Sequence, residues 1–144
     1  ATHPDGIGAI KAMQLAMEEA HLNPEQINYL NAHATSTPVG DISEMKAVVK
    51  TFNNDFKNLK ISATKSMTGH LMGAAGAVEA ILAIKAIQNN IIPPTINTVN
   101  IDPEIPKSLP IVLGDAMDSK INVAMSNTFG FGGHNGTVIF KKIQ

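Results

Sequence analysis

One short stretch, NAHATSTPVGD at residues 31–41, combines a histidine with a cluster of hydroxyl side chains. His33 ends an apolar run, and Thr35 and Thr37 follow it directly. An imidazole can donate or exchange a proton near neutral pH, and hydroxyls beside it can hold a polar ligand. The alternative is a packing histidine at a strand end, followed by a turn whose hydroxyls satisfy their own backbone.

Two further stretches show the same arrangement of unusual residues after an apolar run. Lys65 and His70 lie in SATKSMTGHLMGAAG (62–76), and Phe129 stands before the glycines of SNTFGFGGHNG (126–136). Taken alone, the lysine is an ordinary solvated charge. Two histidines and a lysine, each after a predicted strand, favour a functional site over three separate packing positions.

The periodicity of the apolar residues predicts the elements that must position these side chains. Helical spacing predicts helices at 7–20, 41–52 and 73–88, and apolar runs or alternation predict strands at 27–32, 59–64, 111–113, 121–126 and 136–142. Asp41 and Glu44 have the spacing of a variant capping box and are predicted to start the second helix. The order of elements predicts an α/β fold, in which helices cover a mixed sheet.

The predicted strands explain how the three stretches can form one site. In α/β sheets, ligands bind beyond the carboxyl ends of the strands, so loops from one edge can converge on a single pocket. Lys65 lies among small residues, which favours a buried lysine that needs a charged partner. Glu79, one of the few charges in the helix at 73–88, is the predicted partner. The alternative places Glu79 on the solvent-facing side of that helix.

The composition makes several classes of function poor candidates. Charged residues make up only 16% of the chain, the net charge is −1 and there is no arginine, which argues against nucleic acid as a partner. There is no cysteine, so neither disulfides nor thiolate metal sites are expected. No apolar run reaches the roughly 18 residues typical of a membrane-spanning helix.

Two familiar kinds of binding site do not match the residues. The glycines of GFGGHNG lack the spacing of a dinucleotide-binding loop, and a strand rather than a helix is predicted to follow them. A zinc site of His33, His70 and His134 is disfavoured, because no two of these residues lie at the short helical spacing usual for zinc ligands. No metal ion is therefore expected.

Together the stretches NAHATSTPVGD, TKSMTGHLMGAAGAVE and SNTFGFGGHNG resemble the signature sequences of elongating β-ketoacyl-acyl carrier protein synthases. The resemblance extends in order over nearly all of residues 1–142. It implies a thiolase-like fold of two similar halves, each with a sheet between helices. Residues 1–144 would form the C-terminal half. The nucleophilic cysteine would lie in the absent N-terminal half, and the first strand of the C-terminal half would lie before Ala1.

The resemblance assigns roles to seven residues of this sequence. They are the catalytic His33, His70 and Lys65, the supporting Glu79, the phosphopantetheine-binding Thr35 and Thr37, and the oxyanion and gating residue Phe129. One departure is Ala34, where the family commonly has glycine. The roles of these residues are implied by the family pattern and go beyond what the spacing alone predicts.

The implied activity is a decarboxylative Claisen condensation of an acyl-enzyme thioester with malonyl-acyl carrier protein, in a cytoplasmic homodimer without a cofactor. HATST in place of HGTGT favours fatty acid synthesis over a polyketide ketosynthase, and His70 in place of asparagine disfavours an initiating synthase. A non-catalytic subunit resembling a chain-length factor and a metallohydrolase remain alternatives. Without a cysteine, the isolated chain is expected to be inactive in condensation and to expose apolar faces.

Overall fold

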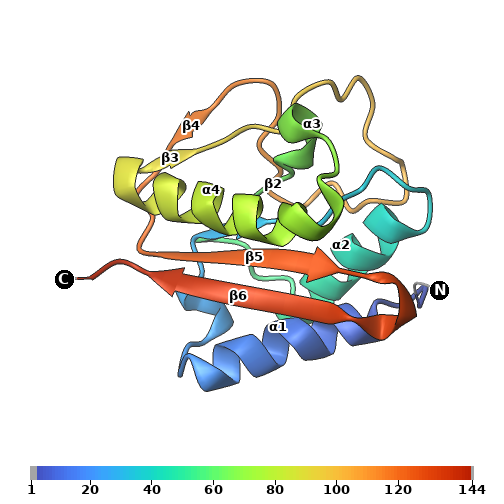
Figure 1. Ribbon diagram of the computed structural model, residues 1–144, viewed down its shortest axis with the longest axis horizontal. Coiled ribbons are helices and arrows are strands. Elements are labelled where there is room, and N and C mark those ends of the chain that lie inside the picture. The colour runs from blue at the N-terminus through green and yellow to red at the C-terminus, as the bar shows by residue number, and fades with distance from the viewer. Residues whose placement is uncertain (1–2, 144) are drawn as a thin grey trace.

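A mixed four-stranded sheet forms the centre of the molecule in the computed structural model, which describes residues 3–143 (Figure 1). The strand order is β2–β1–β5–β6, and the strands are β1 (Tyr29–Asn31), β2 (Lys60–Ser62), β5 (Val123–Phe129) and β6 (Asn135–Lys141). β1 runs parallel to both β2 and β5, whereas β6 is antiparallel to β5. The parallel strands therefore end at one edge of the sheet.

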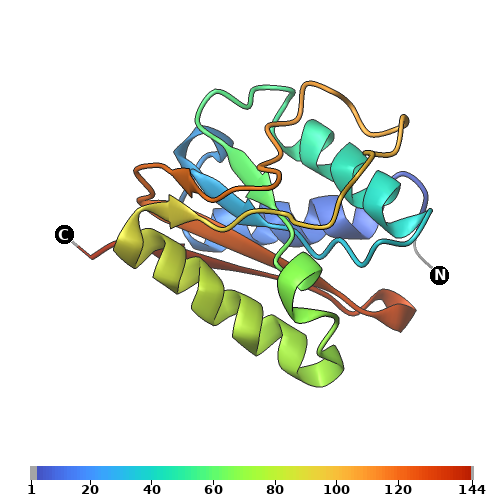
Figure 2. The same ribbon diagram turned by 90° about the horizontal axis from the view of Figure 1, so that it is seen from above.

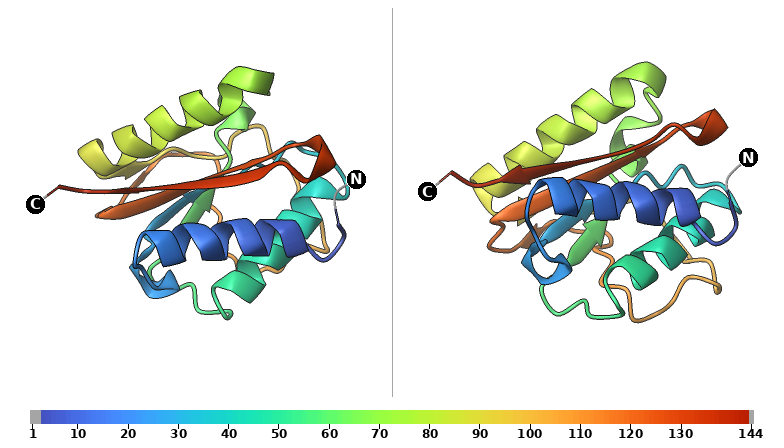
Figure 3. Two further views of the ribbon diagram at one scale, coloured as in Figure 1. Left: turned by 60° about the horizontal axis from the view of Figure 1, so that its bottom comes forward. Right: turned by 90° about the horizontal axis from the view of Figure 1, so that it is seen from below.

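Helices cover both faces of this sheet (Figure 2). α1 (Ile7–Glu19) and α2 (Gly40–Thr51) lie on one face, and α4 (Ala75–Asn89) lies on the other (Figure 3). Each helix buries residues at helical spacing on the side that faces the sheet. The prediction of a layered α/β fold with a mixed sheet between helices is confirmed.

Each face of the sheet has its own apolar core. On the side of α1 and α2 the buried side chains include Met13, Met17, Leu30, Met45, Val48, Ile61 and Met125. On the side of α4 they include Tyr29, Ala83, Ile87, Ile92, Ile121 and Ala124. Burying an apolar side chain of this size contributes roughly 1.5–3 kcal/mol. These two cores fix the sheet edge at which the polar residues lie.

Shorter elements connect the layers. α3 (Lys65–Thr68) follows β2, and a two-stranded antiparallel sheet joins β3 (Ile91–Ile92) to β4 (Met117–Asp118). Single turns of 3-10 helix occur at η1 (Pro24–Gln26), η2 (Met72–Ala74) and η3 (Phe131–Gly133). Among the helices of residues 3–143, none combines the length and apolar character needed to cross a bilayer.

Two local predictions are wrong. Residues 111–113 form only isolated bridges, from Ile111 to Ile61 and from Leu113 to Thr95, because the surrounding prolines interrupt a continuous ladder. The predicted capping box is absent as well. The cap of α2 is Val39, which makes no side-chain capping bond, and the carboxylate of Glu44 instead binds backbone beyond the end of β1.

Candidate active site

The three polar stretches converge at the carboxyl ends of the central strands, as predicted. His33 follows β1, His70 follows α3 at the end of β2, and Phe129 is the last residue of β5. The ring centroids of His33 and His70 are 5.6 Å apart, and those of His33 and Phe129 are 5.7 Å apart. Two imidazoles are therefore close enough to act on one small group.

Lys65 and Glu79 form a buried ion pair, which confirms the predicted contact. Their side-chain atoms Nζ and Oε1 are 2.5 Å apart, and the side chains are 5% and 1% exposed. Lys65 is held in place by the turn that precedes it, because the Asn31 side-chain amide donates to the hydroxyl of Thr64 at 2.9 Å. The pKa of Glu79 is raised, because the effect of burial exceeds the opposing effects of the hydrogen bond and charge of Lys65.

The surroundings of His33 favour the neutral imidazole. Burial lowers the pKa of His33 to about 4, and the charge of Lys65 and the neighbouring His70 add to the shift. For His70 the N–H of Met72 donates to the ring nitrogen Nδ1 at 3.3 Å. In the neutral ring, Nδ1 as acceptor leaves the proton on Nε2. Both rings can thus present an N–H to a ligand.

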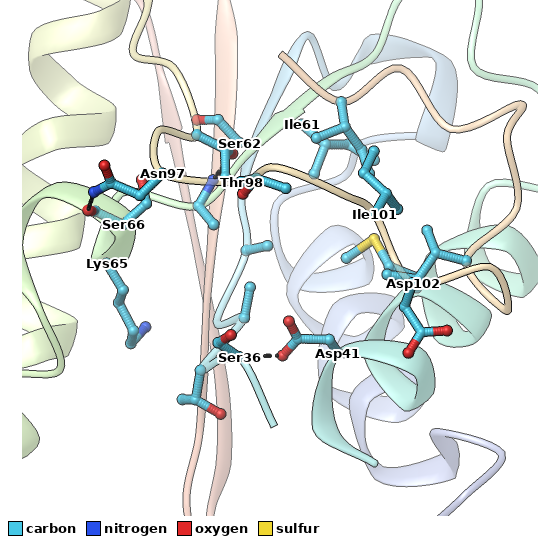
Figure 4. A pocket seen from close by; sticks show the side chains of 18 of the residues that line it. Ser36, Asp41, Ile61, Ser62, Lys65, Ser66, Asn97, Thr98, Ile101 and Asp102 are labelled. Atoms are coloured by element: carbon cyan, nitrogen blue, oxygen red, sulfur yellow. Dashed lines mark hydrogen bonds between the residues drawn. The ribbon is translucent and has the colours of Figure 1, made fainter. Parts of the chain in front are cut away.

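A cavity of about 600 Å³ adjoins His70, and Ala32 and Ala34, the two neighbours of His33, also line it, whereas His33 itself does not. Thr35, Thr37, Lys65 and His70 are among its polar lining residues, and Ile42, Met45, Ile61, Ile105 and Ile111 supply an apolar wall. Figure 4 shows Lys65 reaching from α3 toward this space, with Ser36 and Asp41 hydrogen-bonded across from it. A cavity with hydroxyls on one wall and apolar side chains on another suits a long ligand that carries amide groups.

Glu44 and Asn127 hold the turn that carries His33, and neither was predicted from the sequence. Glu44 is buried and accepts the backbone N–H of His33 at 2.9 Å and that of Ala34 at 2.8 Å. Asn127 donates its side-chain amide to the same carboxylate at 3.1 Å. The available signal was the position of Glu44 directly before Met45 and four residues before Val48, on the apolar side of the predicted helix, and the capping interpretation obscured it.

The glycine-rich stretch places two aromatic rings differently. Phe129 is half-buried and packs against the apolar core beside His33. Phe131 lies in η3 and is 94% exposed. Within residues 3–143, no three His, Asp or Glu side chains gather in a way that could hold a metal ion.

Residues 1–99 match the family described as beta-ketoacyl synthase, C-terminal domain. The chain belongs to this family. It is 51% identical to 3-oxoacyl-[acyl-carrier-protein] synthase 2 of Staphylococcus aureus (strain COL) over 141 residues, which are 98% of this chain and 34% of the relative. The chain therefore spans about a third of the length of the curated relatives it matches.

Solved ketosynthases share the fold. A beta-ketoacyl synthase from Burkholderia phymatum STM815 superposes with a TM-score of 0.91 at 39% identity, covering 99% of this chain and 34% of that one. A structure described as a type II PKS acyl-carrier protein in complex with its ketosynthase contains a chain that superposes with a TM-score of 0.92 at 27% identity. The match covers 99% of this chain and 34% of that chain. These ketosynthase neighbours confirm the prediction of a thiolase-like fold.

Proposed function

We propose that residues 1–144 form the C-terminal domain of a 3-oxoacyl-acyl carrier protein synthase of fatty acid biosynthesis. The observation that carries the proposal is the pair of imidazoles of His33 and His70, 5.6 Å apart at adjacent strand ends. The 51% identity to a 3-oxoacyl-[acyl-carrier-protein] synthase 2 supports the same reaction class. The nucleophilic cysteine would come from the N-terminal part of the full-length enzyme.

The reaction joins two thioesters and releases carbon dioxide. An acyl chain is first transferred from its thioester on the carrier protein to the cysteine sulfur, and the thiol of the carrier protein leaves. The carboxylate of malonyl-acyl carrier protein then leaves as CO₂, and the electron pair of the broken C–C bond forms an enolate with its charge on the thioester oxygen. The enolate carbon attacks the acyl carbonyl, and the cysteine thiolate departs. The role of His33 and His70 is to donate an N–H each to the enolate oxygen, where the negative charge develops.

The ion pair of Lys65 and Glu79 acts on His33 through the charge of Lys65. The positive charge of Lys65 helps to lower the pKa of His33 and so favours the neutral ring at physiological pH. Glu79 holds the ammonium group in place at 2.5 Å. In this proposal Lys65 orients the site and sets its electric field. It does not act as a general base.

The cavity provides the route for the substrate arm. Thr35 and Thr37 lie along its wall, and their hydroxyl oxygens are 3.4 Å apart. We assign these two hydroxyls to the amide groups of the phosphopantetheine arm. The N–H of Phe129 stays a predicted oxyanion donor. For the gating role, the exposure of Phe131 makes it a second candidate, because a gate needs room to move.

The partner of this enzyme is an acyl carrier protein that carries the acyl and malonyl groups. The name of the Staphylococcus aureus relative, 3-oxoacyl-[acyl-carrier-protein] synthase 2, includes the acyl carrier protein. A similar ketosynthase was solved in complex with its acyl-carrier protein. We further propose that the full-length enzyme is a homodimer in the cytoplasm, where its acyl carrier protein would also be found.

Replacing each histidine in the full-length enzyme tests the proposal. His33→Ala and His70→Ala should each reduce malonyl decarboxylation by about 10²–10³-fold, equivalent to about 3–4 kcal/mol for one lost oxyanion donor. Acyl loading of the cysteine should fall much less. His21→Ala, which alters an exposed histidine after α1, is the matched control and should leave both rates unchanged. Equal losses of loading and decarboxylation would contradict the assigned roles.

A non-catalytic subunit resembling a chain-length factor is the second candidate. It would share this fold and would differ by lacking the nucleophile upstream. Sequencing the gene upstream of Ala1 distinguishes the two, because the condensing enzyme requires a cysteine there.

A further inference from the structure

Glu44 is a buried carboxylate to which the proposed reaction gives no role. It lies in α2, is 3% exposed and receives three N–H donors. The backbone N–H of His33 and the Asn127 amide both donate to Oε1, at 2.9 and 3.1 Å, and the N–H of Ala34 donates to Oε2 at 2.8 Å. Both oxygens therefore act as acceptors, and two of the three donors belong to the backbone that carries His33.

The backbone after His33 has a conformation that its residues do not favour. Ala34 has φ of 29° and Ser36 has φ of 59°, which is the left-handed region that side chains with a Cβ rarely adopt. Such a conformation persists only where its surroundings impose it. Glu44 fixes the start of this turn, and Asp41 fixes its end by accepting the N–H of Ser36 at 3.0 Å.

Asn127 fixes the carboxylate in turn. Its side chain is fully buried in β5. The hydroxyl of Thr137, on the neighbouring strand β6, donates to Oδ1 of Asn127 at 2.8 Å, so the amide NH₂ group points to Glu44. A continuous chain of hydrogen bonds thus leads from β6 through β5 and α2 to the backbone of His33.

We infer that Glu44 and Asn127 form a positioning pair that holds the imidazole of His33 in place for the reaction. Neither residue lines the cavity, so substrate binding should not depend on them. The inference rests on the proposed function for its effect on rate. Its structural content, that the pair sets the position of the His33 ring, holds independently of the reaction.

The decisive substitution is Glu44→Gln in the full-length enzyme. Glutamine has the same size but replaces one acceptor by an NH₂ group, so a backbone N–H of His33 or Ala34 faces another donor. We expect malonyl decarboxylation to fall about 10–100-fold, as misplacement of a catalytic group does, with KM and acyl loading of the cysteine within about twofold. Glu18→Gln, at an exposed position of α1, is the matched control and should change neither rate.

A second readout does not depend on activity. The ¹⁵N signals of the His33 ring, assigned with a His33→Gln variant, should shift in Glu44→Gln and stay unchanged in Glu18→Gln. If the wild-type enzyme shows no decarboxylation, the proposed function fails, and the His33 signals still decide whether the pair positions the ring. Unchanged signals together with decarboxylation within about twofold of wild type would overturn the inference.

Thr137→Val covers the case in which Glu44→Gln does not fold. This substitution removes only the hydroxyl that orients Asn127 on the half-buried strand β6. We expect a several-fold loss of decarboxylation and a smaller shift of the His33 signals, with acyl loading retained. If Thr137→Val leaves the His33 signals unchanged in a folded protein, the hydrogen-bond chain does not extend to His33 and the inference is wrong.

Discussion

His33 illustrates how a residue obtains its chemistry from its surroundings. Its pKa is lowered to about 4, first by burial and then by Lys65 and His70. His33 is therefore protonated only at a pH well below the usual pKa of an imidazole. At physiological pH the ring is neutral, and its N–H is available as a hydrogen-bond donor without a net charge. Lys65 is the one cause among these that a substitution can remove without altering the histidines.

Replacing Lys65 should change the titration of His33. In Lys65→Met the pKa of His33 should rise from about 4 while staying below 6.5, because burial still opposes protonation. Lys65→Arg is the matched control and should keep the low pKa, since it retains the charge beside Glu79. Titration of ¹⁵N-histidine signals in the full-length enzyme measures both. The same pKa in the two variants would show that the charge of Lys65 does not act on His33.

Residue types and their order were enough to predict that His33, Lys65 and His70 lie at one edge of the sheet, because each follows a strand and is unusual there; their catalytic roles stay predictions. The pairing of Lys65 with Glu79 could be predicted as well, since a buried lysine needs a partner. Glu44 and Asn127 could not. Their contact joins residues 83 positions apart, and the Glu44 carboxylate reaches backward by 10 and 11 positions to the turn after β1. Such contacts depend on how α2 packs against the sheet.

At the scale of elements, the helices were predicted better than the strands. α1, α2 and α4 each show helical periodicity over 12 or more residues. β1 and β2 have only three residues each, too few for a clear alternation, and their bounds were predicted too wide. The crossing of α1 and α2 was not predicted. It depends on Gly6, which caps α1 with a left-handed φ of 65° where the two helices meet.

Gly6→Ala should therefore destabilise the protein. An added Cβ would lie 2.5 Å from the carbonyl oxygen of Ser43 and 2.8 Å from the Cβ of Ala47, both in α2. Left-handed strain and overpacking together should lower the free energy of unfolding by about 2–4 kcal/mol. Gly73→Ala, where a Cβ meets nothing within 4 Å, should change it by less than about 0.5 kcal/mol. Urea unfolding of both variants is the measurement, and equal stability would contradict the close contact of α1 and α2.

At the scale of the whole molecule, several large apolar side chains lie on the surface. Ile81 and Ile84 of α4 are 57% and 36% exposed, whereas the residues that this helix buries include Ala83, Ala86 and Ile87. Near the histidine pair, Met72 and Phe131 are 74% and 94% exposed. The chain spans about a third of the length of its curated relatives, so these surfaces are candidates for contact with the rest of a longer enzyme.

Residues 1–144 prepared alone should self-associate, because the exposed apolar face of α4 has no other partner in such a preparation. Sedimentation velocity at micromolar concentration should show dimers or larger species. Ile81→Lys should reduce this association, since a charge at the centre of the face opposes its burial, whereas Gln88→Lys at an exposed polar position of α4 should not. The same preparation should show no condensation, because it contains no cysteine thiol. A stable monomer in which Ile81→Lys has no effect would show that the α4 face needs no cover and that these residues form a self-sufficient domain.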